Sequence, residues 1–391
     1  MNSFGKEFIA LIKGAVSGEK VHVSDNFDWN EAFELAMRHS IVPFIFYSVD
    51  AGVVPSEVMS KFNAVFFQSL AISENQIYYI KELSDAFENE GVDFVLLKGS
   101  VLKGMYPSSD MRVMGDADIL IKTEQYDKIK PILEKIGFSE QKDCDPEIIW
   151  DIKGLHLELH KSLFSKRNSD FYDCFGDGWK NAVLTDGKNH TYVLNPEASL
   201  VYLVAHLAKH MRNGGVGVRH VTDIWVYKNK VNVHETVVEK ELEKLKLLDF
   251  YKNILKTIDV WFNNADCDEV TDFITEWILS GASFGTLDRY YLGAALKKKM
   301  ETGKKQSKAD IFLKFAFPPY STMCDLYPVL KKVKILLPVM YIVRAFSRLL
   351  FKRGAVQDCV DKINLSNDDS IDSFRANMEK MGLNYDFINK N

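Results

Sequence analysis

A short apolar run within an otherwise helix-patterned chain places the strongest constraint on the fold. Residues 93–97 read Asp-Phe-Val-Leu-Leu and lie between Gly91 and Gly99. A run of this length that is bounded by glycines favours a buried strand, because helices need longer periodic stretches. Residues 117–121 and the alternating residues 154–160 predict two further strands. The sequence therefore predicts a small sheet inside a largely helical protein.

Helical periodicity dominates on both sides of this sheet. Residues 1–90 predict an N-terminal helical region that includes one long helix over residues 58–88. We expect a sheet-containing core over residues 91–195, a C-terminal helical domain over residues 196–353 and a polar tail over residues 354–391. The expected fold class is α+β, with a small mixed-sheet core between N- and C-terminal helical regions.

Charge and cysteine usage argue against several classes of protein. The 391 residues carry a formal net charge of -5, so no global basic field marks a nucleic-acid binder. The five cysteines are scattered and never form a C-x-x-C pair, which argues against a disulfide framework and a structural zinc site. We therefore expect a reducing compartment and a cytoplasmic protein.

The sequence predicts no membrane span. A spanning helix needs about 20 mostly apolar residues, whereas the most apolar late stretch, residues 335–350, is interrupted by Pro338 and Arg344. Basic residues between Lys331 and Arg353 leave open a membrane-surface helix or an RNA contact. A basic amphipathic helix packed on the protein's own core is the favoured interpretation, so we expect no peripheral membrane contact.

Two short motifs follow one another at the first two predicted strands. Lys98-Gly99-Ser100 ends the first strand, and Asp116-Ala117-Asp118 opens the second. A Gly-Ser turn that leads into a helix exposes backbone N–H groups and a hydroxyl, which suits it to hold phosphate oxygens. Asp116 and Asp118 are two residues apart on a strand, so their carboxylates point to the same side. Carboxylates this close repel each other unless a cation neutralises them or one is protonated, and hard oxygen ligands favour Mg²⁺ or Mn²⁺.

A third acid would complete a two-metal site. Glu158 alternates with apolar residues on the third predicted strand, and we choose it as this acid. Two ions held in this way lie about 3.5–4 Å apart and clamp an in-line phosphoryl displacement. Lys98 and Arg112 are candidates to neutralise a triphosphate, and Arg219 is a candidate to contact nucleotide or acceptor. The alternatives are ordinary salt bridges for Lys98 and Arg112, and a polar network between helices for Arg219.

A histidine pair lies further along the chain. His206 and His210 are spaced i, i+4, so they share one face of a predicted helix. Such a pair can bind zinc, but the glutamate of the H-E-x-x-H motif is absent. Buried or hydrogen-bonded structural histidines are the favoured interpretation.

Three blocks of sequence resemble one known family. The segment LLKGSVLKGMYPSSDMRVMGDADILIKTEQYDKIKPILEKIGF resembles the bacterial family of uncharacterised nucleotidyltransferases, within the polymerase-β nucleotidyltransferase superfamily. WNEAFELAMRHSIVPFIFYS and HLAKHMRNGGVGVRHVTDIW resemble the N-terminal block and the second conserved block of that family. The resemblance covers most of residues 25–350. It implies a polymerase-β-type core for the expected sheet.

The resemblance also implies an activity, the transfer of a nucleoside monophosphate from an NTP to an acceptor hydroxyl. Asp116, Asp118 and Glu158 would hold the metal ions, and the Lys98-Gly99-Ser100 turn would hold the triphosphate. The acceptor is open: a small molecule, a sugar, a protein side chain or an RNA end. Many relatives carry aspartate where this chain has Glu158, so a catalytically degenerate nucleotide-binding or scaffold protein is one alternative. An RNA or membrane-surface binder that uses the basic segment is another.

Overall fold

The computed structural model describes most of the 391-residue chain. The described residues are 1–143, 146–166, 169–302, 317, 320, 323–324, 327, 329–351 and 368–384. The chain forms two compact units. The first comprises residues 1–210, 216–284 and 381–383, and the second comprises residues 211–215, 285–380 and 384–391. The expected boundaries after residues 90, 195 and 353 stay predictions.

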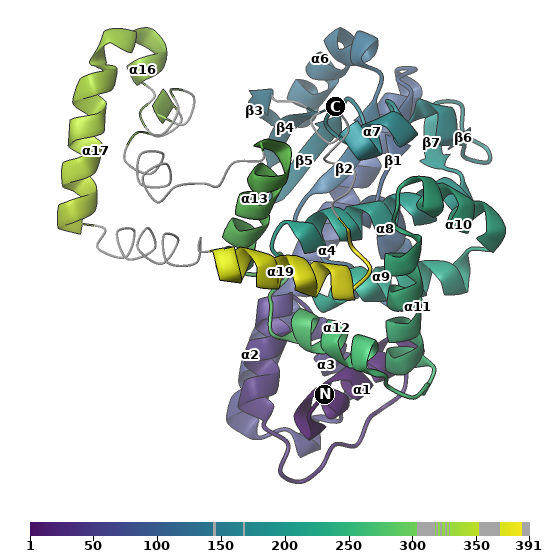
Figure 1. Ribbon diagram of the computed structural model, residues 1–391. Helices are drawn as coiled ribbons and strands as arrows, with labels where there is room; N and C mark the ends of the chain where they lie inside the picture. The colour runs from purple at the N-terminus through teal and green to yellow at the C-terminus, as the bar shows by residue number, and fades with distance from the viewer. Residues whose placement is uncertain are drawn as a thin grey trace. The chain divides into compact units, whose positions relative to one another are not determined.

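A mixed sheet of seven strands forms the centre of the first unit (Figure 1). The strand order is β3-β4-β5-β2-β1-β7-β6. The bounds are β1 Phe94–Leu96, β2 Ala117–Ile121, β3 Ser139–Asp143, β4 Glu147–Ile152, β5 Leu155–His160, β6 Ala182–Leu184 and β7 Thr191–Leu194. β2 pairs antiparallel with β1 and parallel with β5, so the two strands that carry the predicted acids are neighbours. The predicted class, an α+β protein with a mixed sheet flanked by helices, is confirmed.

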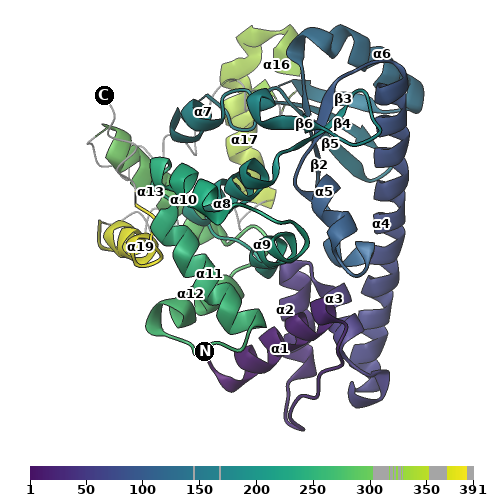
Figure 2. The ribbon, with the colours of Figure 1, turned by 90° about the vertical axis from the view of Figure 1, so that its right-hand side faces the viewer.

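Helices of the first unit precede the strands in the chain, lie between them and follow them. Their bounds are α1 Ser3–Ser17, α2 Trp29–His39, α3 Val42–Ser48, α4 Ser56–Asn89, α5 Gly99–Leu102, α6 Tyr126–Ile136, α7 Ser169–Phe175, α8 Pro196–Arg212, α9 Val218–Lys230, α10 Glu235–Lys244, α11 Leu248–Phe262 and α12 Glu269–Leu279. The long helix expected over residues 58–88 is α4, which runs for 34 residues. Figure 2 shows α8 and α9 on the side of the sheet opposite α4.

The two faces of the sheet differ in polarity because successive strand residues point to opposite sides. On one face, Ile119, Leu157 and Trp150 are buried in a hydrophobic cluster with side chains of α4 and α6. Burying such apolar surface stabilises the fold by about 25 cal/mol per Å². The alternate residues of β2 and β5, including Asp118 and Glu158, therefore lie on the other face, towards α8 and α9.

The second unit is helical in its described part. Its helices are α13 Leu287–Thr302, α16 Val329–Lys332, α17 Leu337–Phe351 and α19 Asp368–Lys380. Lys299 of α13 pairs with Asp372 of α19 at 2.7 Å, so part of the expected polar tail is an ordered helix. No helix in the described ranges is both long and apolar enough to cross a membrane. The apolar stretch expected as an amphipathic helix is α17, and its Met340 packs against a small buried cluster around Met323.

Candidate active site

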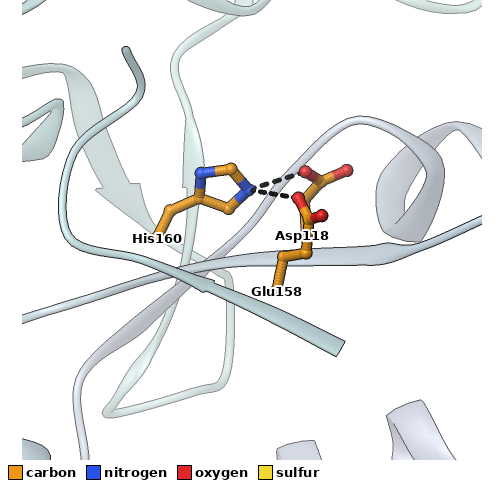
Figure 3. A group of neighbouring side chains, drawn as sticks. All are labelled: Asp118, Glu158 and His160. Atoms are coloured by element: carbon orange, nitrogen blue, oxygen red, sulfur yellow. Dashed lines mark hydrogen bonds and ion pairs between the residues drawn. The ribbon is translucent and has the colours of Figure 1, made fainter. Parts of the chain in front are cut away.

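Strand register brings Asp118 and Glu158 together. In the parallel pair of β2 and β5, Asp118 lies directly opposite Glu158, and both side chains point away from the hydrophobic cluster. His160 is two residues beyond Glu158 on β5, so it shares this face. One oxygen or nitrogen atom from each of Asp118, Glu158 and His160 lies within 4.8 Å of the others. We call these three residues the acid–histidine cluster (Figure 3).

The cluster is held by short contacts around one carboxylate oxygen. Lys98 Nζ donates to Asp118 Oδ1 at 2.6 Å, and His160 Nε2 donates to the same oxygen at 2.7 Å. His160 Nε2 is also 3.5 Å from Glu158 Oε2. Asp118 is 3% exposed, so these contacts replace water around its charge. Lys98 thus neutralises an acid of the cluster, as the salt-bridge alternative anticipates.

The pKa directions follow from burial and from these neighbours. Burial alone would raise the pKa of Asp118, but the charge of Lys98 and the hydrogen bond from His160 hold it well below its ordinary value. The pKa of Lys98 is raised, because the attraction of Asp118 outweighs desolvation. The pKa of His160 is also raised, since its hydrogen bonds to Asp118 and Glu158 outweigh burial. The site therefore presents an ionised carboxylate whose Oδ1 is already bound by Lys98 and His160, so a metal ion would have to share or displace these contacts.

Asp116 lies beside the cluster rather than within it. It immediately precedes β2 and is half-buried, and it is not one of the three residues whose ligand atoms converge. Burial and the nearby charge of Asp118 raise the pKa of Asp116. The carboxylates are thus close enough to repel one another, which is the condition that a bound cation relieves. His160 takes the place in the convergent group that the sequence assigned to Asp116.

The Lys98-Gly99-Ser100 turn lies at the N-terminus of α5. Lys98 has φ 39°, a backbone conformation that costs of order 1–3 kcal/mol and is concentrated at functional sites. A Cβ on Gly99 would lie 2.7 Å from the side chain of Met114, so any larger residue here would force Met114 to move. Ser100 Oγ is buried and has no hydrogen-bond partner in the described structure. A buried hydroxyl without a partner is costly, and a ligand oxygen would satisfy it.

The two predicted arginines belong to a polar network behind this turn. Arg112 Nε donates to Asp223 Oδ1 of α9 at 2.8 Å, and Tyr106 donates to the same oxygen at 2.7 Å. Arg219 donates to the carbonyl of Val113 at 2.5 Å. These bonds tie the segment between β1 and β2 to α9, which matches the network considered as the alternative for Arg219.

The histidine pair lies on α8, on the site side of the sheet. His206 Nε2 and His210 Nε2 are 3.0 Å apart. Burial is the largest cause that lowers the pKa of His210 to about 3, so this imidazole is neutral at pH 7. In the described residues, only the acid–histidine cluster brings three ligand atoms close enough for a metal ion. The zinc alternative for the pair gains no support from this arrangement.

The donor atoms of the cluster suit a divalent cation. Asp118 and Glu158 offer carboxylate oxygens of the kind that Mg²⁺ and Mn²⁺ prefer. His160 would add an imidazole nitrogen, which Mn²⁺ or Zn²⁺ accepts more readily than Mg²⁺, once Nε2 gives up the proton that it donates to Asp118. The signal for His160 was present in the sequence, because it alternates with Glu158 on one strand. A pattern of carboxylates alone does not include it.

Comparison with known proteins decides the family. The profile of a family described as uncharacterised nucleotidyltransferase matches residues 25–263, more than half of the chain. The protein belongs to the uncharacterised nucleotidyltransferase family. The resemblance drawn from the three sequence blocks is therefore confirmed. No curated protein matches the chain.

One solved structure also resembles this nucleotidyltransferase. It is described as the solution structure of the antibiotic-resistance factor ANT(2'')-Ia, which reveals substrate-regulated conformation dynamics. The match has 10% sequence identity and a TM-score of 0.34, and it covers 49% of this chain and 100% of the other. Family membership, the sheet and the cluster are therefore the observations on which a functional proposal rests.

Proposed function

We propose that this family member transfers a nucleoside monophosphate from an NTP to an acceptor hydroxyl with the help of Mg²⁺ or Mn²⁺. The observation that carries the proposal is the convergence of Asp118, Glu158 and His160 on one face of the sheet. Beside them lies a turn with a buried, unpartnered hydroxyl, Ser100 Oγ, in the described structure. Together these features provide cation ligands and a phosphate-binding turn in one site.

Each residue has a role in the proposed reaction. Asp118 and Glu158, with Asp116 adjacent, would hold the cations, which would neutralise charge on the transferring phosphoryl group. Ser100 and the backbone of Gly99 would donate hydrogen bonds to phosphate oxygens, and Lys98 would offset their negative charge. Arg112 and Arg219 are proposed to hold the segment between β1 and β2 in place through their bonds to Asp223 and to the carbonyl of Val113.

The bond changes are those of an in-line displacement. The acceptor oxygen forms a bond to the α-phosphorus while the bond from that phosphorus to the α–β bridging oxygen breaks. The acceptor hydroxyl loses its proton to the carboxylate of Glu158, and pyrophosphate leaves. Positioning and charge neutralisation, rather than covalent catalysis by the protein, supply the rate enhancement.

The test uses α-³²P-labelled NTPs with Mg²⁺ or Mn²⁺, and small-molecule, protein and RNA fractions of a cell extract as acceptors. We expect label to enter one fraction with wild-type protein and not with Asp116→Asn/Asp118→Asn. Asp186→Asn, at an exposed loop position, is the matched control and should behave as wild type. Calorimetry with a non-hydrolysable NTP runs in parallel. Binding without transfer in any fraction would favour the degenerate alternative, and absence of both binding and transfer would contradict the proposal.

A further inference from the structure

A row of polar side chains on α8, which we call the wall, faces the acid–histidine cluster. Tyr202, His206 and Lys209 are spaced i, i+4, i+7, so they lie on one face of that helix. The ring of Tyr202 is 5.7 Å from Lys98 Nζ, and the rings of Tyr202 and His206 are 6.2 Å apart. Because Lys98 contacts Asp118 directly, this face of α8 begins at the acid–histidine cluster.

Three histidines extend this wall from α8 to α9. His206 and His210 come from α8, and His220 comes from α9, with ring centroids 6.2 Å and 5.8 Å from them respectively. Burial is the main cause that lowers the pKa of His210 and of His220 to about 3. Neutral imidazoles each carry one N–H donor and do not repel the nearby lysines. One of His206 and His210 donates its N–H to the other at 3.0 Å, so two of the three rings keep an N–H for a ligand. The wall therefore offers hydrogen-bond donors without an excess of positive charge.

Lys209 is the ammonium of this wall that lacks a partner. It is half-buried, and it has no hydrogen bond or ion pair within the described part of the chain. Burial and the charge of Lys98 lower the pKa of Lys209, while Glu147, Asp118 and Glu158 lie within electrostatic reach and oppose this effect. A partly desolvated cation without a contact partner is unfavourable, and a bound anion would relieve this cost.

Resting on the proposed function, we infer that Lys209, His206, His210 and His220 form the subsite for the β- and γ-phosphates of the NTP. The sheet carries the acids and the helices carry the donors, so a phosphate chain would run from the Gly99-Ser100 turn towards α8. Charge-assisted hydrogen bonds from Lys209 would hold the chain, and neutral imidazoles would donate to its remaining oxygens. The same contacts would stabilise pyrophosphate as it leaves.

The experiment measures by calorimetry, in the presence of Mg²⁺, the binding of three ligands. They are a non-hydrolysable NTP, an NMP and inorganic pyrophosphate. Lys209→Met should weaken NTP and pyrophosphate binding by about tenfold or more and leave NMP binding unchanged. Lys209→Arg should restore most of the affinity, because it keeps the charge. Lys252→Met on α11, at an exposed position, is the control. Lys209→Gln is measured alongside, so that the conclusion does not depend on one folded variant.

The outcomes separate this inference from the proposal on which it rests. If wild-type protein binds NTP and Lys209→Met binds it equally well, the subsite is contradicted while the proposed function stands. Equal weakening of NTP and NMP binding would also contradict it, because the effect would then not concern the β- and γ-phosphates. A wild-type protein that binds no NTP would overturn both. Loss confined to NTP and pyrophosphate supports the assignment.

Discussion

Removal of the Asp223 carboxylate is expected to destabilise the first unit strongly. Asp223 Oδ1 accepts hydrogen bonds from Arg112 at 2.8 Å and from Tyr106 at 2.7 Å. The side chains of Arg112 and Asp223 are only 10% and 6% exposed. Asp223→Ala would leave a guanidinium and a phenol hydroxyl buried without their acceptor.

The magnitude follows from this burial. Breaking a buried ion pair by removing one partner costs about 3–5 kcal/mol, because the remaining charge is uncompensated. For a unit of this size, about 2 °C of melting temperature is lost per kcal/mol. Asp223→Ala should therefore lower the melting temperature by about 6–10 °C. The paired variant Arg112→Met/Asp223→Ala should lose less than the sum of the two single variants, since neither charge is then left alone.

The assay is thermal unfolding by circular dichroism of the four proteins of this cycle, together with calorimetric NTP binding. A drop below about 2 °C for Asp223→Ala, which corresponds to about 1 kcal/mol, would refute the reasoning. A second result would also refute the structural role given to Arg112. If Arg112→Met kept the wild-type melting temperature but lost NTP affinity, Arg112 would be a nucleotide ligand, the role that the sequence suggested.

Three further variants test other parts of the first unit. Lys98→Met removes the ammonium group 2.6 Å from Asp118 Oδ1. The affinity for Mn²⁺ in the absence of nucleotide, measured by electron paramagnetic resonance, should therefore rise about tenfold. Unchanged or weaker binding would show that Lys98 does not compete with the ion. Gly99→Ala places a Cβ 2.7 Å from Met114 and should cost about 1–3 kcal/mol in urea unfolding; an unchanged midpoint would contradict the close packing. His39 is fully buried, and burial lowers its pKa to about 4. The folded state therefore favours the neutral imidazole, and the stability that this histidine contributes is complete above pH 6.5 and is lost as the pH falls to about 4. The advantage of wild type over His39→Gln in urea unfolding should shrink by about 3 kcal/mol between pH 7.5 and 4, and an advantage that does not vary with pH would exclude this role.

Sequence reasoning located β1, β2 and β5, but it did not find β4, although Ile148 and Trp150 of β4 are buried in the same cluster. Residues 117–121 were expected as a strand and form β2, whose five residues are all buried. β3 was not expected, because Ser139–Asp143 is exposed at every position and carries no apolar alternation. Such an edge strand is specified by its pairing with β4 rather than by its own composition. Propensity within one segment could not predict it.

The sequence pattern predicted that Asp118 and Glu158 lie together, as they do across β2 and β5, but it did not predict that His160 joins them. Spacing placed Asp116 and Asp118 on one side of a strand, but β2 begins at Ala117, so Asp116 lies just outside the regular register. His160 and Lys209 belong to elements that are far apart in the chain, β5 and α8. Their positions depend on how β5 and α8 pack, and a local pattern does not contain that information.

The register between β2 and β5 links the stability of the core to the composition of the site. Asp118 pairs with Glu158 because Ile119 pairs with Leu159 and Ala117 pairs with Leu157, and all four apolar or small partners are fully buried. A slip of one residue would turn Glu158 into the hydrophobic cluster and bring a leucine beside Asp118. Burying an unpaired carboxylate costs far more than any local rearrangement regains. The apolar packing on one face therefore excludes a slip of one residue and keeps Asp118 and Glu158 together on the other face.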